Sequence, residues 1–218
     1  MSSDENVDLR PKVPFSSART VGRFCLDTCV IIGINHREQF VEDEEKSLEE
    51  LFQLRREGHV ELSQTDTVNF ERGMLQLNDL AWQRRLESVG LVEVCGAFIS
   101  GHSLRESSVG AGPDDDARLK RALEIVHPRA IACAKPRNND VRDAMHIATA
   151  IRYGYQGFVT TDDDVLKAAA NISTAFGGFL LMLPSQAVAW VNREVAHHHR
   201  TKVIRAEQMK NLGEEMEE

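Results

Sequence analysis

Short apolar runs alternate with longer amphipathic stretches along this chain of 218 residues. Apolar and β-branched residues predict strands at 23–29, 59–65, 91–98, 157–160 and 179–183. Apolar residues at helical spacing predict helices at 30–34, 42–57, 67–77, 79–89, 116–126, 141–153, 163–170 and 185–196. The segment 100–116 is rich in Gly, Ser and Asp, so we predict a long loop there.

The alternation of strands and helices predicts the fold class. It favours an α/β fold, a three-layer αβα sandwich around a central, mainly parallel sheet with right-handed crossovers. We expect one domain at 21–196, preceded by a flexible leader at 1–20 and followed by a charged C-terminal extension at 197–218. Ligands of such sheets bind beyond the carboxyl ends of the strands, so residues just past those ends are the first candidates for a site.

The composition is that of a globular protein, because 42% of the residues are hydrophobic. A net charge of −8 excludes a protein that coats nucleic acid with a basic surface, but it is compatible with a local basic groove. The four cysteines form no Cys-x-x-Cys pair, which favours thiols in a reducing compartment. The N-terminus lacks a signal-peptide pattern, and the uncharged segment 168–192 is too interrupted to cross a bilayer. We therefore expect a cytoplasmic protein that does not bind membranes.

Acidic residues lie just past the predicted strands or on the helices that follow them. Asp27 ends the first strand and Asp162 follows the fourth, while Glu71 and Asp143 lie on predicted helices. Carboxylates that converge in a cleft repel one another, and a divalent cation removes that repulsion. Oxygen ligands suit Mg²⁺ or Mn²⁺, and two such ions can clamp the attacking and leaving oxygens of a phosphodiester.

Each acid taken alone also has a structural explanation. Asp66 is suited to cap a helix, and Asp140 is a first-turn acid that favours the helix dipole. Glu71 alone would be an ordinary surface glutamate, and the three consecutive acids at 162–164 cannot all be ligands. The prediction of a metal site therefore depends on the ordered set of acids.

The order and spacing of these acids resemble the PIN-domain family of metal-dependent nucleases, over about residues 24–183. The motifs that carry the resemblance are Leu26-Asp27-Thr28, the Asp66-Thr67-Val68 helix start that leads to Glu71, Asp143 in the run 143–150, and Val159-Thr160-Thr161-Asp162. The resemblance implies a PIN-like αβα sandwich with an acidic cleft that hydrolyses RNA, less often DNA.

The resemblance also implies a role for each acid. The carboxylates that would hold the ions and carry catalysis are Asp27, Glu71, Asp143 and Asp162. Glu71 would hold a second Mg²⁺ or Mn²⁺ or orient the attacking water. Thr160 would support the cleft by hydrogen bonding, and Asp164 would contact the metal site indirectly, through one of its ligands. The protein would then be an endoribonuclease that uses a water molecule activated by the ion.

Two features depart from the family pattern. Cys29 stands where the family commonly has Asn or Ser, so a polar contact near the ion or phosphate is in question. The chain is longer than the compact toxin members, with extra residues at 100–137 and after His197, which weakens assignment to a toxin–antitoxin pair. The resemblance is compatible with a homodimer and with an antitoxin or inhibitor protein as partner.

Local positive charge predicts where RNA could bind. The segment 117–142 contains seven basic residues and two acidic ones. We expect Lys135, Arg137 and Arg142 to line the substrate groove. A second basic stretch at 193–210 suits a phosphate-contacting tail, a partner-binding tail or a frayed end. We interpret His146, one turn after Asp143, as a side chain that packs beside the cleft.

Two other function classes are compatible with parts of this pattern. A non-catalytic PIN-like module that binds RNA or protein would share the fold, but degenerate members usually lose acids that this chain retains. A phosphotransfer domain of the receiver or haloacid-dehalogenase type needs a second acid close to the first-strand Asp, which the surroundings of Asp27 lack. Stabilisation by a metal ion separates the nuclease from the binding module.

Overall fold

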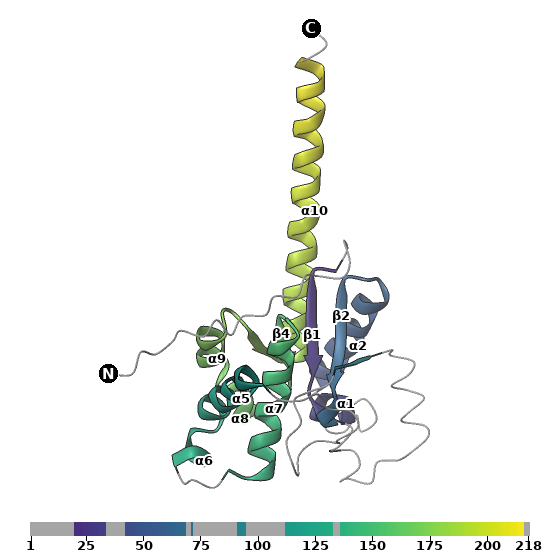
Figure 1. Ribbon diagram of the computed structural model, residues 1–218. Coiled ribbons are helices and arrows are strands. Elements are labelled where there is room, and N and C mark those ends of the chain that lie inside the picture. The colour runs from purple at the N-terminus through teal and green to yellow at the C-terminus, as the bar shows by residue number, and fades with distance from the viewer. Residues whose placement is uncertain are drawn as a thin grey trace, which may run out of the picture.

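The core of the protein is a five-stranded sheet (Figure 1). The structure is a computed structural model and describes residues 20–33, 42–68, 71, 91–94, 112–132 and 136–215. The strands lie in the order β3-β2-β1-β4-β5, and their bounds are Gly22–Leu26 (β1), Val60–Thr65 (β2), Val92–Val94 (β3), Gly157–Val159 (β4) and Leu180–Met182 (β5). Every strand pair is parallel, which confirms the predicted α/β class.

Helices cover both faces of the sheet, in agreement with a three-layer sandwich. They are α1 (Thr28–Gly33), α2 (Glu42–Arg56), α5 (Pro113–Val126), α6 (Pro128–Ala132), α7 (Asn138–Arg152), α8 (Asp163–Leu166), α9 (Ala169–Ala175) and α10 (Pro184–Glu215). Phe24 and Leu26 of β1 pack on one face with α2 and α10. Cys25 and Phe158 pack on the other face with α5, α7 and α9. Alternate residues of each buried strand therefore face opposite layers.

The strand order creates a topological switch point between β1 and β4. From β1 the chain proceeds to β2 and β3 on one side, and then forms β4 and β5 on the other. Leu26 pairs with Val159, so the two strands end at the same level. Crevices of this kind are the usual ligand sites of open parallel sheets. Asp27 and Thr160, the residues that directly follow β1 and β4, lie at this crevice.

The helices α5 and α7 each begin three residues earlier than the sequence predicted. Residues 113–116 are therefore helical and not part of a long loop. In both helices a first-turn acid reaches back to the backbone N–H that precedes the helix. The Gly112 N–H donates to Asp115 Oδ2 at 3.1 Å, and the Arg137 N–H donates to Asp140 Oδ2 at 2.9 Å. This contact satisfies a group that the helix itself leaves unpaired.

Three further elements differ from the prediction. The short helix α6 was not predicted, although Pro128 is a favourable first residue for a helix. The predicted helix at 163–170 is divided into α8 and α9. Helix α10 continues without a break through residue 196, and its second half projects away from the sheet (Figure 1). None of the described helices is both long enough and apolar enough to span a membrane.

Several predictions fall on residues that the structure does not describe. They concern the leader at 1–19, most of the predicted helices at 67–77 and 79–89, the end of the strand at 91–98, and the loop at 100–111. Among the candidate site residues, Lys135 lies outside the described part of the chain.

Candidate active site

Asp27 occupies the switch point of the sheet. Its N–H donates to the carbonyl oxygen of Val159 at 2.9 Å, which fixes the backbone between the ends of β1 and β4. Asp27 is 7% exposed, and its carboxylate accepts three hydrogen bonds. Oδ1 accepts from the Thr28 N–H at 2.6 Å, whereas Oδ2 accepts from the Thr160 hydroxyl at 2.5 Å and from the Cys29 thiol at 3.2 Å.

Burial raises the pKa of Asp27 above its ordinary value of 3.8. The positive charge of His146 and the hydrogen bonds from Thr160 and Cys29 lower this pKa in part, and the negative charge of Asp143 raises it further. The ionised carboxylate is therefore held in place by donors but lacks enough positive charge around it. A cation at this position would remove that deficit.

Thr160 connects Asp27 to Asp162. The Thr160 side chain is fully buried, and its hydroxyl donates to Asp27 while it accepts from the Asp162 N–H at 3.0 Å. Asp162 is the N-cap of α8, and its Oδ1 accepts from the N–H groups of Asp164 at 2.7 Å and Val165 at 3.4 Å. One oxygen of Asp162 is thus used by the helix, and the backbone position of this acid is tied to that of Asp27.

Asp143 projects from α7 and contacts a histidine. Nε2 of His127 lies 2.9 Å from Oδ2 of Asp143, and Nδ1 of the same ring lies 3.7 Å from Oδ1 of Asp140. The hydrogen bond to Asp143 raises the pKa of His127 above 6.5, and burial partly opposes this. Asp143 and Asp162 line one cavity of about 300 Å³, together with His127, Arg137, Asn138, Asn139, Asp140 and Asp164.

Glu71 is held by two side chains from other segments. Its carboxylate accepts a short hydrogen bond from the Thr28 hydroxyl, and its Oε2 lies 3.2 Å from Nε2 of His146. Burial alone would raise the pKa of Glu71, but the hydrogen bond and the charge of His146 hold this pKa below 4.5. For His146 burial has the opposite effect and would lower the pKa, but Glu71, Asp27 and Asp143 together raise this pKa above 6.5.

The four predicted acids come from four segments of the chain, and the described contacts link them. Asp27 and Asp162 share Thr160, Asp143 and Asp162 share a cavity, and Asp27 and Glu71 both contact Thr28. Their oxygen-only donor set has the chemistry of Mg²⁺ and Mn²⁺ ligands. Within the described ranges, however, no group of three or more His, Cys, Asp or Glu side chains is arranged to hold a metal ion.

The residues expected to bind substrate differ in exposure. The Arg137 side chain is 79% exposed and pairs with Asp140, with Nη2 2.8 Å from Oδ1. Arg142 is 8% exposed, and its Nη1 lies 3.4 Å from Oδ1 of Asn139. Arg142 also lowers the pKa of Glu71 through its charge. Only Arg137 of these two offers an accessible guanidinium beside the acids.

Sequence reasoning missed the two histidine contacts. His146 was interpreted as packing beside the cleft, but it also contacts Glu71, and its spacing of one turn from Asp143 was the available signal. His127 had no signal beyond its place in the basic region 117–142. Cys29 does supply a polar contact, because burial raises its pKa to about 12 and its protonated thiol donates to Asp27.

A comparison of the chain with models of known protein families finds no match, and a comparison with curated proteins finds none either. A functional assignment therefore depends on the chemistry of this site. The informative features are the buried Asp27 at the switch point and the acids that the fold brings toward it.

Proposed function

We propose that this protein is a metal-dependent endoribonuclease with a PIN-like fold. The observation that carries the proposal is the position of three acids from separate segments around the carboxyl ends of β1 and β4. Asp27 is buried there with a raised pKa, Asp162 is joined to it through Thr160, and Asp143 shares a cavity with Asp162. Asp27 is the buried member of the set, whereas Asp143 is half-buried and Asp162 is exposed to solvent. A carboxylate whose pKa is raised by burial and by a second acid, with more exposed carboxylates beside it at a sheet crevice, is a favourable position for a divalent cation.

In this proposal Asp27, Asp143 and Asp162 would hold the principal Mg²⁺ or Mn²⁺. Glu71 would help to hold a second ion or orient the attacking water. When bound, the ions would neutralise the carboxylates and lower the pKa of a water molecule, so that it loses a proton more easily at neutral pH and becomes a better nucleophile toward a phosphodiester.

The chain's own residues orient these carboxylates. Thr160, Cys29 and the Thr28 N–H hold Asp27 in one orientation, and His146 with the Thr28 hydroxyl holds Glu71. Such supporting hydrogen bonds increase the affinity of a metal site because the ligands lose less freedom when the ion binds. The exposed Arg137 would contact a phosphate of the substrate, and the buried Arg142 would act through its charge near Glu71.

A second candidate is a non-catalytic PIN-like module that binds RNA or protein. It is favoured by the hydrogen bonds that already engage two of the acids, since Asp143 contacts His127 and Asp162 caps α8. In such a module these acids would have only structural roles, and the protein would show no response to divalent cations.

Thermal unfolding in EDTA, Mg²⁺ and Mn²⁺ tests the proposal. The parent protein is compared with Asp162→Asn, because Asn caps helices as well as Asp does, and with Asp163→Asn as a control of equal charge change on the same helix. A ligand that binds the folded state alone adds about 2.7 kcal/mol to the free energy of unfolding at a hundredfold excess over its Kd. We expect Mn²⁺ to stabilise the parent and Asp163→Asn but not Asp162→Asn.

Cleavage of single-stranded RNA in Mn²⁺ by the same three proteins completes the test. The parent and Asp163→Asn should cleave, and Asp162→Asn should not. A parent protein that neither gains stability from either ion nor cleaves RNA would favour the non-catalytic module.

A further inference from the structure

A second, larger cavity adjoins the acidic one. It has a volume of about 600 Å³ and lies between the α5–α6 junction and the α8–α9 segment. We call it the α6 groove and define it by Ile125, Pro128, Arg129, Arg137, Lys167 and Asn171. The two cavities share His127, Arg137, Asp140 and Asp164, so the α6 groove lies directly beside the cavity that Asp143 and Asp162 line.

The charged side chains of the α6 groove suit an anion. Its cations are Arg129, Arg137 and Lys167. The two carboxylates on its walls each have a cation beside them, because Asp140 lies 2.8 Å from Arg137 and Asp164 lies 2.6 Å from Lys167. The side chains of Arg137 and Lys167 are 79% and 73% exposed, so both can also reach a ligand. A phosphate in the groove would therefore meet positive charge without an unpaired carboxylate.

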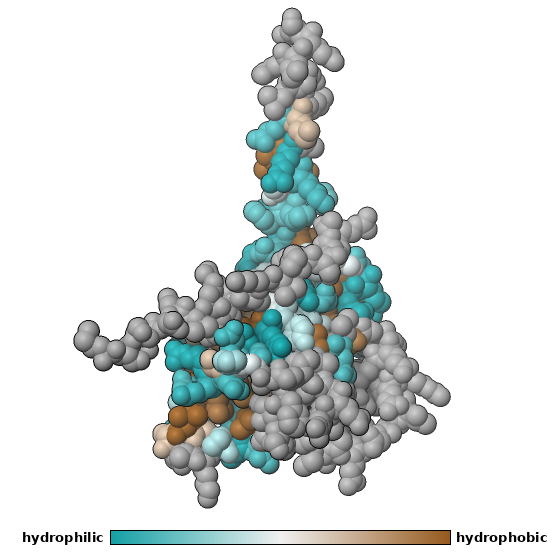
Figure 2. Space-filling model, in the orientation of Figure 1, coloured by the Kyte–Doolittle hydropathy of each residue, from teal (hydrophilic) through white to brown (hydrophobic). Residues whose placement is uncertain are grey.

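The rest of the wall is apolar or carries an amide. Ile125, Pro128 and Ala168 provide apolar surface, and Asn171 provides both a donor and an acceptor. Figure 2 shows apolar residues at the surface in the region of α6, at the lower left of that view. Cations for phosphate, apolar surface for sugar and base, and an amide for a base edge together match a nucleotide. A base is accessible in this way only in a single strand.

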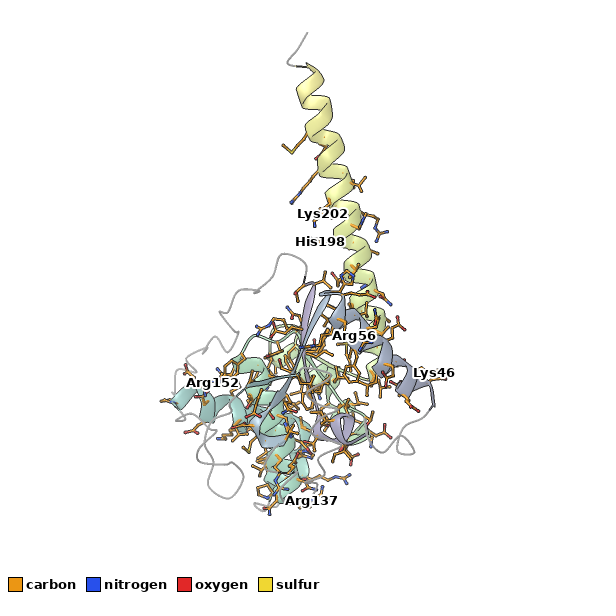
Figure 3. The ribbon with its side chains drawn as sticks, turned by 90° about the vertical axis from the view of Figure 1, so that its right-hand side faces the viewer. Lys46, Arg56, Arg137, Arg152, His198 and Lys202 are labelled. Atoms are coloured by element: carbon orange, nitrogen blue, oxygen red, sulfur yellow. The ribbon has the colours of Figure 1, made fainter. Side chains whose placement is uncertain are left out.

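We propose that the α6 groove binds a nucleotide adjacent to the scissile phosphate of single-stranded RNA. This inference rests on the proposed nuclease function and extends it to the substrate path. One wall of the groove is formed by the segment 125–130. Arg137 lies at the opposite end of the molecule from His198 and Lys202 of α10 (Figure 3), so the basic second half of α10 is not part of this path.

Binding of a short fluorescein-labelled single-stranded RNA, followed by fluorescence anisotropy in EDTA, tests the groove without cleavage. Arg129→Glu and Lys167→Glu reverse the charge of one groove residue each. Lys120→Glu is the matched control, because Lys120 is an exposed base of α5 that does not line the groove. All four proteins should remain folded at the assay temperature, since the altered side chains are exposed and the ion pair with Asp164 that Lys167→Glu breaks lies at the surface.

We expect both groove variants to raise the Kd for RNA about fivefold or more, with Lys120→Glu close to the parent. The dependence of log K on log salt should become shallower by about 0.7 for each RNA phosphate that the variant no longer neutralises. Equal affinities for the parent and both groove variants would overturn the inference, and so would an equal loss of affinity in Lys120→Glu, because binding would then depend on overall charge.

The result is separable from the test of the proposed function. Asp162→Asn should bind RNA in EDTA at least as tightly as the parent, because binding at the groove does not require a metal ion and the substitution removes a carboxylate that repels phosphate. If the groove variants cleave RNA in Mn²⁺ with unchanged KM, the groove assignment is wrong and the nuclease proposal stands. If the parent does not cleave RNA but the groove variants still lose affinity, the nuclease proposal is wrong and the groove remains an RNA-binding site.

Discussion

Nε2 of His146 lies 3.2 Å from Oε2 of Glu71, and Nδ1 of the same ring lies 2.5 Å from the Thr65 hydroxyl. The His146 side chain is 1% exposed, and its ring stacks on Phe158 with a centroid separation of 5.8 Å. A histidine that is fixed on three sides cannot turn without disturbing the core. It therefore holds the Glu71 carboxylate in one position relative to the carboxyl edge of the sheet.

The contact between His146 and Glu71 predicts a pH-dependent stability. The lowered pKa of Glu71 stabilises the fold above its unfolded value of 4.5, and the raised pKa of His146 stabilises it below the unfolded value of 6.5. The contribution of His146 is lost as the pH rises through its folded pKa, whereas that of Glu71 is lost only as the pH falls through the folded pKa of Glu71. Chemical denaturation should therefore show His146→Gln to be less stable than the parent at about pH 6, with a smaller difference at about pH 9. A difference that does not change with pH would contradict this explanation.

Asp27 should make the metal-free protein less stable than a neutral residue would. Because its pKa is raised in the folded state, its contribution to stability is greatest below 3.8 and declines as the pH rises through the folded pKa. We expect Asp27→Asn to unfold at a higher temperature than the parent at neutral pH in EDTA. The same variant should lose the stabilisation by Mn²⁺. An unfolding temperature below that of the parent in EDTA would indicate that the hydrogen bonds to Asp27 outweigh its burial.

Thr160 should contribute to stability through its hydroxyl. In Thr160→Val the side chain keeps its shape, but Asp27 is deprived of a donor and the Asp162 N–H of an acceptor. We expect a decrease of about 1–3 kcal/mol in the free energy of unfolding, measured by urea denaturation. Thr160→Ser keeps the hydroxyl and should be destabilised less. Equal decreases in the two variants would assign the effect to packing.

Cys29 should react slowly with alkylating reagents. Its pKa of about 12 keeps the thiol protonated at neutral pH, and the thiolate is the reactive form. Peptide mapping by mass spectrometry, which follows this cysteine separately from the others, should show much slower iodoacetamide labelling in the native protein than in urea. Cys29→Ser should retain the hydrogen bond to Asp27 and the response to Mn²⁺, whereas rapid native labelling would contradict the hydrogen-bonded thiol.

Much of the architecture could be predicted from local patterns. The first strand and the amphipathic helix at 42–57 follow from the spacing of apolar residues. The helix matches the prediction to within one residue, whereas the strand predicted at 23–29 ends at Leu26, and residues 28 and 29 belong to α1. The early starts of α5 and α7 were also local, since they depend on Asp115 and Asp140, but apolar periodicity does not register a polar cap. The candidate acids were identified in the same way, from their positions after strands and on helices.

Among the described residues, the sequence by itself determined most of the segments that form strands and helices and which acids follow them, because these properties depend on neighbours within a few residues. The tertiary structure alone decided that β1 and β4 are adjacent, so that Asp27 meets Thr160, which is 133 positions away. It also decided that His127 contacts Asp143 and that His146 contacts Glu71. These contacts depend on strand order and on side-chain directions set by packing, and neither leaves a periodic signal in the chain.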